Sequence, residues 1–320
     1  MTGGSAPRRI ARLLVGVGMT VMAACSTAPQ PGGGPRDLPR REWLSAEPPR
    51  AVILAVHGFN DYSNAFTDFG AYAAAGGVAV HAYDQPGFGA NPDAGLWAGS
   101  GALVASLVRE RRRLTALYPG RPVYLLGDSM GAAVLIAAVA AGAPLETAGM
   151  IMTAPAVWGG DQLNPFYRAT LWLAAHLVPA LKLTGEGLGV LASDNLEVLQ
   201  ALGADPLFIK ETRVDAIAGL VALMDLALAR SPAVRGPLLV LSGSRDEVVP
   251  PDAQHAMLER LSAEPCTEVV YPEGWHLLLR DLQREQVWDD ILAWIDGAPL
   301  PSGLAAPCGE GVRLAAREPQ

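Results

Sequence analysis

Short apolar runs alternate with longer helical patterns along residues 38–156 and again along residues 231–298. The runs are rich in Val, Ile, Leu and Ala, as is typical of strands that are buried on both faces. Six of them predict strands: residues 51–57, 78–84, 122–127, 149–153, 237–243 and 266–271. Five stretches predict helices: residues 65–75, 101–117, 130–141, 251–261 and 281–294. This alternation predicts an α/β fold with a mostly parallel central sheet and helices on both faces.

One long segment, residues 157–230, interrupts the alternation. It contains the apolar helical patterns LWLAAHLVPALKL and AIAGLVALMDLAL, and it shows no strand pattern. A structureless loop of this length is unusual in a compact domain. We therefore predict an inserted helical cap over the carboxyl edge of the sheet, where open α/β sheets bind ligands. The Pro/Gly/Ala-rich tail, residues 299–320, is expected to run over the surface.

The N-terminal segment has the pattern of an export signal. Three arginines precede an uncharged run over residues 13–24, which at about 12 residues is shorter than the ~20 needed to span a bilayer. We predict a signal peptide over residues 1–24 and a flexible, Pro/Gly/Ser-rich tether over residues 25–37.

Small residues before Cys25 resemble the bacterial lipobox, in which the cysteine is acylated and becomes the first mature residue. This resemblance implies an exported lipoprotein anchored in a membrane, and Ser26 goes with sorting to the outer membrane. An ordinary secretory signal that happens to precede a free cysteine is the alternative.

Composition narrows the function classes. With 50% hydrophobic and 18% charged residues the chain is globular with a large core. The net charge is −8, and loss of the three arginines with residues 1–24 makes it −8 − 3 = −11, which disfavours binding to nucleic acid. No spaced Cys/His cluster suggests a metal site, and no cofactor is predicted. Cys266 and Cys308 could pair in an oxidising compartment or stay as two buried thiols.

The motif Gly127-Asp128-Ser129-Met130-Gly131 joins a predicted strand to a predicted helix. A serine in this G-x-S-x-G context sits on a strained turn, and the glycines leave room where helix and strand crowd together. We therefore predict that Ser129 is a nucleophile.

A serine hydroxyl needs a base to remove its proton and an acid to orient that base. Asp246 follows the predicted strand 237–243, and His276 lies in the loop after the last predicted strand. This order of nucleophile, acid and histidine is the one found with the G-x-S-x-G motif. Glu247 is the competing acid, which we rank below Asp246.

Two backbone N–H groups usually stabilise the oxyanion of acyl transfer. Met130 follows the nucleophile and is expected to supply one of them. Phe59, in the His57-Gly58-Phe59 turn after the first core strand, is expected to supply the other. His57 and Asp84 are interpreted as structural residues of neighbouring loops.

Several motifs together resemble the monoacylglycerol lipase and lysophospholipase group of α/β-hydrolases. They are His57-Gly58-Phe59-Asn60-Asp61, Tyr83-Asp84-Gln85-Pro86-Gly87-Phe88-Gly89, Gly127-Asp128-Ser129-Met130-Gly131, Gly243-Ser244-Arg245-Asp246 and Gly274-Trp275-His276. The resemblance covers most of residues 38–296 and implies the α/β-hydrolase fold. In one departure, Asp128 stands where many monoacylglycerol lipases carry His.

The resemblance implies a serine hydrolase that cleaves the ester of a single-chain lipid, a monoacylglycerol or a lysophospholipid, through an acyl-enzyme and without a cofactor. A short-chain esterase, a thioesterase or a peptidase on the same scaffold is an alternative. A non-catalytic envelope lipoprotein is another, although such a protein has no need for Ser129, Asp246 and His276 together. The sequence does not indicate an oligomeric state.

Overall fold

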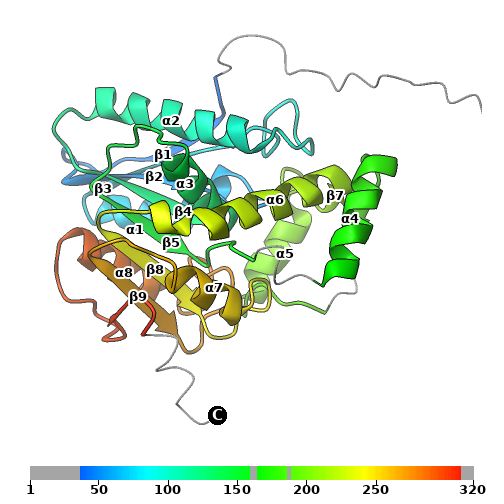
Figure 1. The fold of residues 1–320 in the computed structure, drawn as a ribbon. Helices are drawn as coiled ribbons and strands as arrows, with labels where there is room; N and C mark the ends of the chain where they lie inside the picture. Colours follow the sequence, from blue (N-terminus) through cyan, green and yellow to red (C-terminus); the bar gives the residue numbers. More distant parts are fainter. Residues whose placement is uncertain (1–36, 159–163, 186–188, 311–320) are drawn as a thin grey trace, which may run out of the picture. The chain divides into compact units, whose positions relative to one another are not determined.

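The central feature is an eight-stranded sheet with the order β1-β3-β2-β4-β5-β8-β9-β10. The computed structural model describes residues 37–158, 164–185 and 189–310. The inner strands run parallel, and only the two edge strands, β1 and β10, pair antiparallel with their neighbours. The predicted fold class, a mostly parallel sheet with helices around it, is confirmed (Figure 1).

All six predicted strands are present within one residue of their predicted bounds. They are β2 (Ala51–Val56), β3 (Val78–Tyr83), β4 (Val123–Asp128), β5 (Gly149–Thr153), β8 (Leu238–Gly243) and β9 (Cys266–Tyr271). The predicted helices are present as α1 (Thr67–Ala75), α2 (Ser100–Leu117), α3 (Met130–Ala140), α7 (Pro251–Leu258) and α8 (Arg284–Ile295). A short 3-10 helix, Ser63–Phe66, occupies the predicted start of α1.

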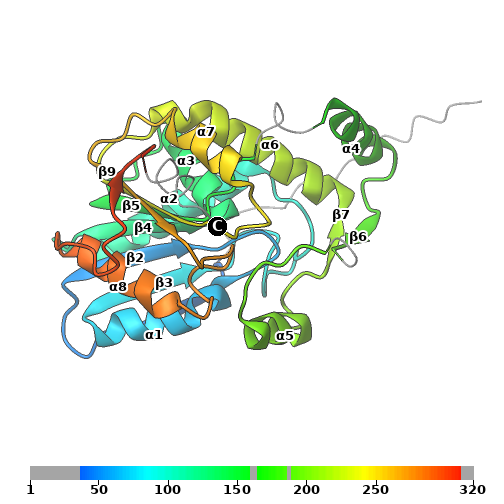
Figure 2. The ribbon, with the colours of Figure 1, turned by 90° about the horizontal axis from the view of Figure 1, so that it is seen from below.

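Helices cover both faces of the sheet, and alternate residues of each strand contribute to two separate cores. In β2, Val52, Leu54 and Val56 pack with α2 and α3, whereas Ala51 and Ile53 pack with α1 and α8. Figure 2 shows α1 and α8 on one side of the sheet and α2, α3, α6 and α7 on the other. Burial on both faces explains why the strands appear in the sequence as continuous apolar runs.

The parts of the cap segment (residues 157–230) that the structure describes, 157–158, 164–185 and 189–230, contain three helices and two short strands. The helices are α4 (Pro165–Leu177), α5 (Leu196–Ala204) and α6 (Val214–Arg230); a 3-10 turn, Ser231–Ala233, follows α6. The strands β6 (Lys182–Thr184) and β7 (Glu211–Arg213) pair antiparallel, so the expectation of no strand in this segment is wrong. Three residues are too few to show an alternating pattern.

Of the three cap helices, α6 packs most closely against the rest of the fold. Leu223, Ala227 and Leu228, in the second half of α6, are buried in the core that α3 and the sheet form. The two other cap helices, α4 and α5, have no buried residues. The second half of α6 therefore anchors the cap segment to the sheet.

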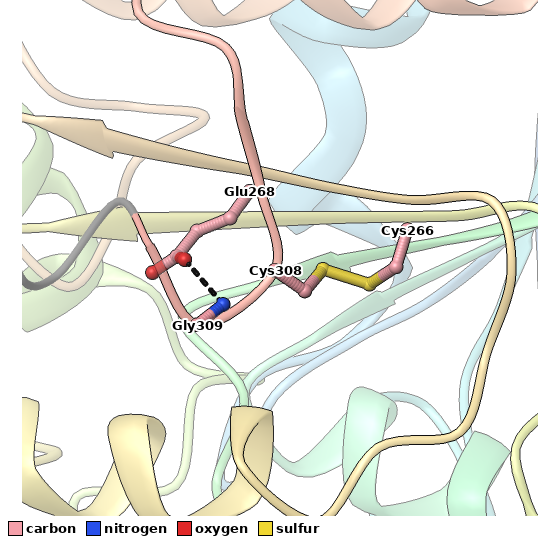
Figure 3. The surroundings of a disulfide bond; sticks show 4 residues. All are labelled: Cys266, Glu268, Cys308 and Gly309. Atoms are coloured by element: carbon pink, nitrogen blue, oxygen red, sulfur yellow. Dashed lines mark hydrogen bonds between the residues drawn. A yellow bond between two sulfur atoms is a disulfide. The ribbon is translucent and has the colours of Figure 1, made fainter.

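Both edge strands were missing from the sequence prediction. β1 (Arg40–Trp43) is a polar strand at one edge, and β10 (Ala306–Pro307) pairs with β9 at the other. A disulfide joins Cys308 to Cys266, and the N–H of Gly309 donates to Glu268 Oε2 over 2.9 Å (Figure 3). Part of the expected surface tail therefore belongs to the sheet.

The predicted signal peptide, Cys25 and nearly all of the predicted tether lie outside the described residues. Among the residues that the structure does describe, no helix is both long enough and apolar enough to cross a bilayer.

Candidate active site

Ser129 lies on a sharp turn between β4 and α3. Its φ of 51° and ψ of −112° are unusual for a residue with a side chain, and such conformations cost of order 1–3 kcal/mol. A Cβ atom on Gly127 would lie 2.6 Å from the nitrogen of Ala132, and one on Gly131 would collide with the carbonyl oxygen of Val56. The two glycines are therefore required by close backbone approach, and the turn presents the Ser129 side chain at the carboxyl edge of the sheet.

The structure brings Ser129, His276 and Asp246 together. Ser129 Oγ lies 3.0 Å from His276 Nε2, and His276 Nδ1 lies 2.9 Å from Asp246 Oδ2. A carboxylate only accepts hydrogen bonds, so Nδ1 carries the proton and Nε2 is left as the acceptor for the serine hydroxyl. This is the arrangement that a general base requires.

Asp246 is held by the loop that follows β8. Its Oδ1 accepts from the N–H groups of Val248 and Val249 over 2.8 and 2.9 Å, which leaves Oδ2 to face His276. The competing acid, Glu247, is exposed and accepts from the N–H of Leu191. The geometry thus favours Asp246 as the partner of the histidine.

Charges around His276 favour its protonated form. Burial by itself lowers the pKa of His276, but the net shift is upward, because Asp246 and Asp128 together outweigh burial and the opposing charge of Arg280. A stabilised imidazolium makes His276 a better acceptor for the serine proton as bond formation proceeds.

Asp281 holds the loop that carries His276. Its Oδ2 accepts from the N–H of Trp275 over 2.7 Å, and its Oδ1 accepts from the hydroxyl of Ser193 over 2.6 Å. Burial raises the pKa of Asp281 to about 6, although both hydrogen bonds act in the opposite direction. The role of Asp281 is not apparent from the sequence, since an aspartate at the start of a predicted helix looks like an ordinary surface acid.

A second group of charges lies beside the nucleophile. Arg280 Nη2 donates to Asp61 Oδ2 over 2.6 Å, and the hydroxyl of Thr153 donates to Asp128 Oδ1 over 2.6 Å. Burial raises the pKa of Asp128, while Arg280 and Thr153 oppose the shift. Asp61 and Arg280 are 219 positions apart in the chain, so no local sequence pattern could have paired them.

The two expected oxyanion donors flank the serine. Met130 begins α3, so its N–H has no acceptor within the helix. Phe59 follows Gly58, where a Cβ atom would lie 3.4 Å from Cβ of Ser129. Neither N–H takes part in the backbone hydrogen bonds that join the described residues outside helices and strands. Both groups therefore remain free to bind a developing oxyanion.

His57 and Asp84 have the structural roles that the sequence suggested. The buried His57 ring accepts from the N–H of Gln85 over 2.9 Å and contacts the carbonyl of Gly58 over 2.8 Å. Asp84 accepts from the N–H groups of Ser63 and Ala90. Both side chains fix the loops on which the candidate oxyanion donor Phe59 depends.

A cavity of about 790 Å³ opens onto Ser129 and His276. Its wall next to the serine is polar and includes Asp61, Asp128 and Arg280. The rest is largely apolar, and the cap segment contributes Leu199, Leu202, Phe208, Ile217, Leu220, Val221 and Met224. Ligand sites commonly have about 300–1,000 Å³, so the cavity is large enough for a substrate.

Within residues 37–158, 164–185 and 189–310, no cluster of three His, Cys, Asp or Glu side chains could hold a metal ion.

The comparisons with known proteins agree with this geometry. Residues 47–283 match the family model Hydrolase_4, described as serine aminopeptidase, S33. The chain belongs to this family. The family match and the structural likeness agree on the α/β-hydrolase fold, and the protein is a serine hydrolase.

Among curated proteins, the monoacylglycerol lipase of Mycolicibacterium smegmatis is 26% identical over 258 residues, which cover 79% of this chain and 90% of that protein. Human monoglyceride lipase is 25% identical over 279 residues, which cover 83% of this chain and 89% of the human protein. The chain thus matches these relatives over nearly their whole length.

Among solved structures, the monoacylglycerol lipase of Paleococcus ferrophilus has a TM-score of 0.70 at 21% identity, over 82% of this chain and 99% of that one. A soluble variant of monoglyceride lipase from Saccharomyces cerevisiae, in complex with a substrate analog, has a TM-score of 0.70 at 16% identity, over 84% of this chain and 99% of that one. At these identities the likeness shows the fold.

Proposed function

We propose that the protein hydrolyses the carboxylic ester of single-chain lipids, with monoacylglycerols and lysophospholipids as the candidate substrate classes. The observation that carries this proposal is the apolar cavity that opens onto Ser129 and His276. Each methylene that leaves water contributes about 0.8 kcal/mol, so such a wall favours an acyl chain over a peptide. The lipase names of the relatives support the same substrate class.

In the proposed reaction, Ser129 Oγ attacks the ester carbonyl carbon while His276 Nε2 takes the hydroxyl proton. The carbonyl oxygen becomes an oxyanion, to which Met130 and Phe59 donate their N–H groups. Each such donor contributes about 2.7–4 kcal/mol to the transition state in a serine protease. Collapse breaks the ester bond, and the imidazolium returns its proton to the leaving alcohol.

Water then completes the cycle. His276 takes a proton from a water molecule, whose oxygen attacks the acyl carbon. The bond between that carbon and Ser129 Oγ then breaks, and the imidazolium gives its proton to Oγ, which releases the fatty acid and restores the Ser129 hydroxyl. Asp246 keeps Nδ1 protonated in both halves.

The experiment that tests the substrate class compares monoacylglycerols, lysophospholipids and p-nitrophenyl esters over a series of chain lengths. The proposal expects kcat/KM to rise in a graded manner with chain length, because each additional methylene adds apolar contact in the cavity. Preference for acetyl esters, with no gain from longer chains, would contradict a lipid substrate and favour a short-chain esterase.

We further propose that the mature protein is an exported lipoprotein, acylated on Cys25 and anchored on the periplasmic face of a membrane, most simply the outer membrane. The arginine-led apolar run before Ala23-Ala24-Cys25 supports this, and so does the Cys266–Cys308 disulfide, since disulfides persist mainly in oxidising compartments. Two acyl chains give stable anchoring where one is marginal.

In a bacterial host, the unaltered chain should incorporate labelled palmitate and fractionate with membranes, whereas Cys25→Ser should do neither. Equal labelling of both proteins would exclude acylation at Cys25.

A further inference from the structure

The turn that carries the candidate oxyanion donor Phe59 is hydrogen-bonded to the cap segment. The N–H of Ile209 donates to the carbonyl oxygen of Asn60 over 3.0 Å, and Asn60 Nδ2 donates to Thr212 Oγ1 over 2.7 Å. Thr212 belongs to β7 and is buried, so water competes little for its hydroxyl. Both partners thus hold Asn60 from the cap side.

A third hydrogen bond lies two residues further along the turn. The hydroxyl of Tyr62 donates to Asp205 Oδ2 over 2.6 Å, and Asp205 Oδ1 accepts from the N–H of Leu207. Asp205 directly follows α5, so the same stretch of the cap segment contacts the turn at two places.

Apolar contacts connect the same two parts of the molecule. The ring of Phe59 packs edge-on against Phe88 and Trp97, with centroid distances of 5.7 and 6.4 Å. Trp97 in turn lies directly against Gly219 of α6, where a Cβ atom would collide with the indole. The Phe59 side chain therefore reaches the cap segment through one intervening ring.

Backbone conformation makes these contacts relevant to the Phe59 N–H. Asn60 has a φ of 64°, in the left-handed region that costs free energy for residues with a side chain. Asparagine adopts this region more readily than most residues, and the hydrogen bonds of Asn60 to Thr212 and Ile209 hold it there. Loss of the bond between Asn60 and Thr212 should let the adjoining Phe59 peptide rotate.

We propose that Asn60 and Thr212 are positioning residues, which act through Phe59: their hydrogen bond fixes the Phe59 N–H in the orientation that the oxyanion requires. The cap segment then sets the rate of ester cleavage as well as the shape of the acyl site. This inference rests on the proposed ester hydrolysis and on the role of Phe59 in it.

The variant Thr212→Val removes the hydroxyl and keeps the shape of the side chain, and Thr212→Ser restores an acceptor. Asn60→Gly removes the amide and still permits a positive φ. Thr170→Val is the matched control, because the hydroxyl of Thr170 donates only within α4, to the carbonyl of Phe166.

The measurements are kcat and KM for p-nitrophenyl butyrate, together with the inhibition constant of a trifluoromethyl ketone with the same acyl chain. The ketone forms a tetrahedral adduct whose oxygen occupies the oxyanion position. Complete loss of one donor costs about 10²–10³ in kcat, so a misaligned donor should cost about tenfold. We expect Thr212→Val and Asn60→Gly to lower kcat about tenfold with KM nearly unchanged, and to weaken ketone binding by a similar factor.

Thr212→Ser should recover most of the activity, and Thr170→Val should match the unaltered protein. If Thr212→Val does not fold, Asn60→Gly carries the test. Unchanged kcat and ketone affinity in the folded variants would overturn the inference while leaving the proposed function intact. Absence of any ester turnover by the unaltered protein would instead refute the proposed function, and the inference with it.

Discussion

Replacement of Asp246 by asparagine should abolish turnover through the tautomer of His276. The backbone N–H groups of Val248 and Val249 both donate to Oδ1 and cannot turn away, whereas the Gln254 amide that donates to Oδ2 over 3.2 Å can turn its oxygen toward an NH₂ group, so the oxygen of the new amide takes the Oδ1 position. Its NH₂ group then replaces Oδ2 and faces His276 Nδ1 from 2.9 Å. Since an NH₂ group only donates, Nδ1 must become the acceptor and Nε2 must carry the proton. The imidazole can then no longer accept the proton of Ser129.

The corresponding change in a serine protease lowers kcat by about 10⁴, which at 1.36 kcal/mol per tenfold is about 5 kcal/mol of transition-state stabilisation. We expect a loss of that order for Asp246→Asn, measured with a p-nitrophenyl ester after circular dichroism has shown the fold to be intact. Glu247→Gln is the matched control and should retain nearly full activity, because the exposed Glu247 contacts the N–H of Leu191 and not the histidine. Retention of a tenth of the activity by Asp246→Asn, or a greater loss in Glu247→Gln, would refute the assignment of the acid.

Two further predictions concern the pH profile and the acyl cavity. His276 acts as a base only when it is neutral, so kcat/KM should rise with pH through its raised pKa. Asp128→Asn removes a carboxylate that raises this pKa and should move the acid limb of the profile to lower pH, whereas Asp252→Asn, at an exposed position, should leave the limb in place. An unmoved acid limb in Asp128→Asn would contradict a role of the Asp128 charge in raising the pKa of His276. Gly203 lines the cavity, and an added Cβ there would have no atom within 4 Å, so the side chain of Gly203→Trp has room to enter the cavity and should lower kcat/KM for long acyl chains far more than for butyrate. Ala222→Trp, on the exposed side of α6, should change neither value. A parallel loss on all chain lengths in Gly203→Trp would place the acyl site elsewhere.

The core of the fold was predictable because its strands are buried on both faces. Six continuous apolar runs of strand length leave little choice of secondary structure. The edge strands β1 and β10 carried no such signal, since RREW is polar and two residues cannot form a pattern. What places β10 in the sheet is its pairing with β9 and the disulfide between Cys266 and Cys308, which are contacts between distant parts of the chain.

In the candidate site, too, some residues could be predicted from the sequence and others could not. Ser129, Asp246 and His276 each follow a predicted strand, and the carboxyl ends of parallel strands meet at one edge of a sheet. Asp61 ends the His57–Asp61 motif and Arg280 lies in no motif, so nothing in the sequence pairs them; only the folded chain brings their side chains within 2.6 Å. The hydrogen bond between Asn60 and Thr212 likewise joins a core loop to the cap segment. No local sequence pattern predicts where the cap segment lies relative to that loop.

The most direct test of the account is the release of fatty acid from a monoacylglycerol by the unaltered protein and by Ser129→Ala. The nucleophile forms the bond that is made and broken, so its loss should lower turnover by on the order of 10⁶, as triad substitutions do in another serine hydrolase. A fluorophosphonate probe should label the unaltered protein and not the variant. Release of fatty acid by Ser129→Ala at more than about a tenth of the original rate would contradict the central claim that Ser129 is the nucleophile of a lipid esterase.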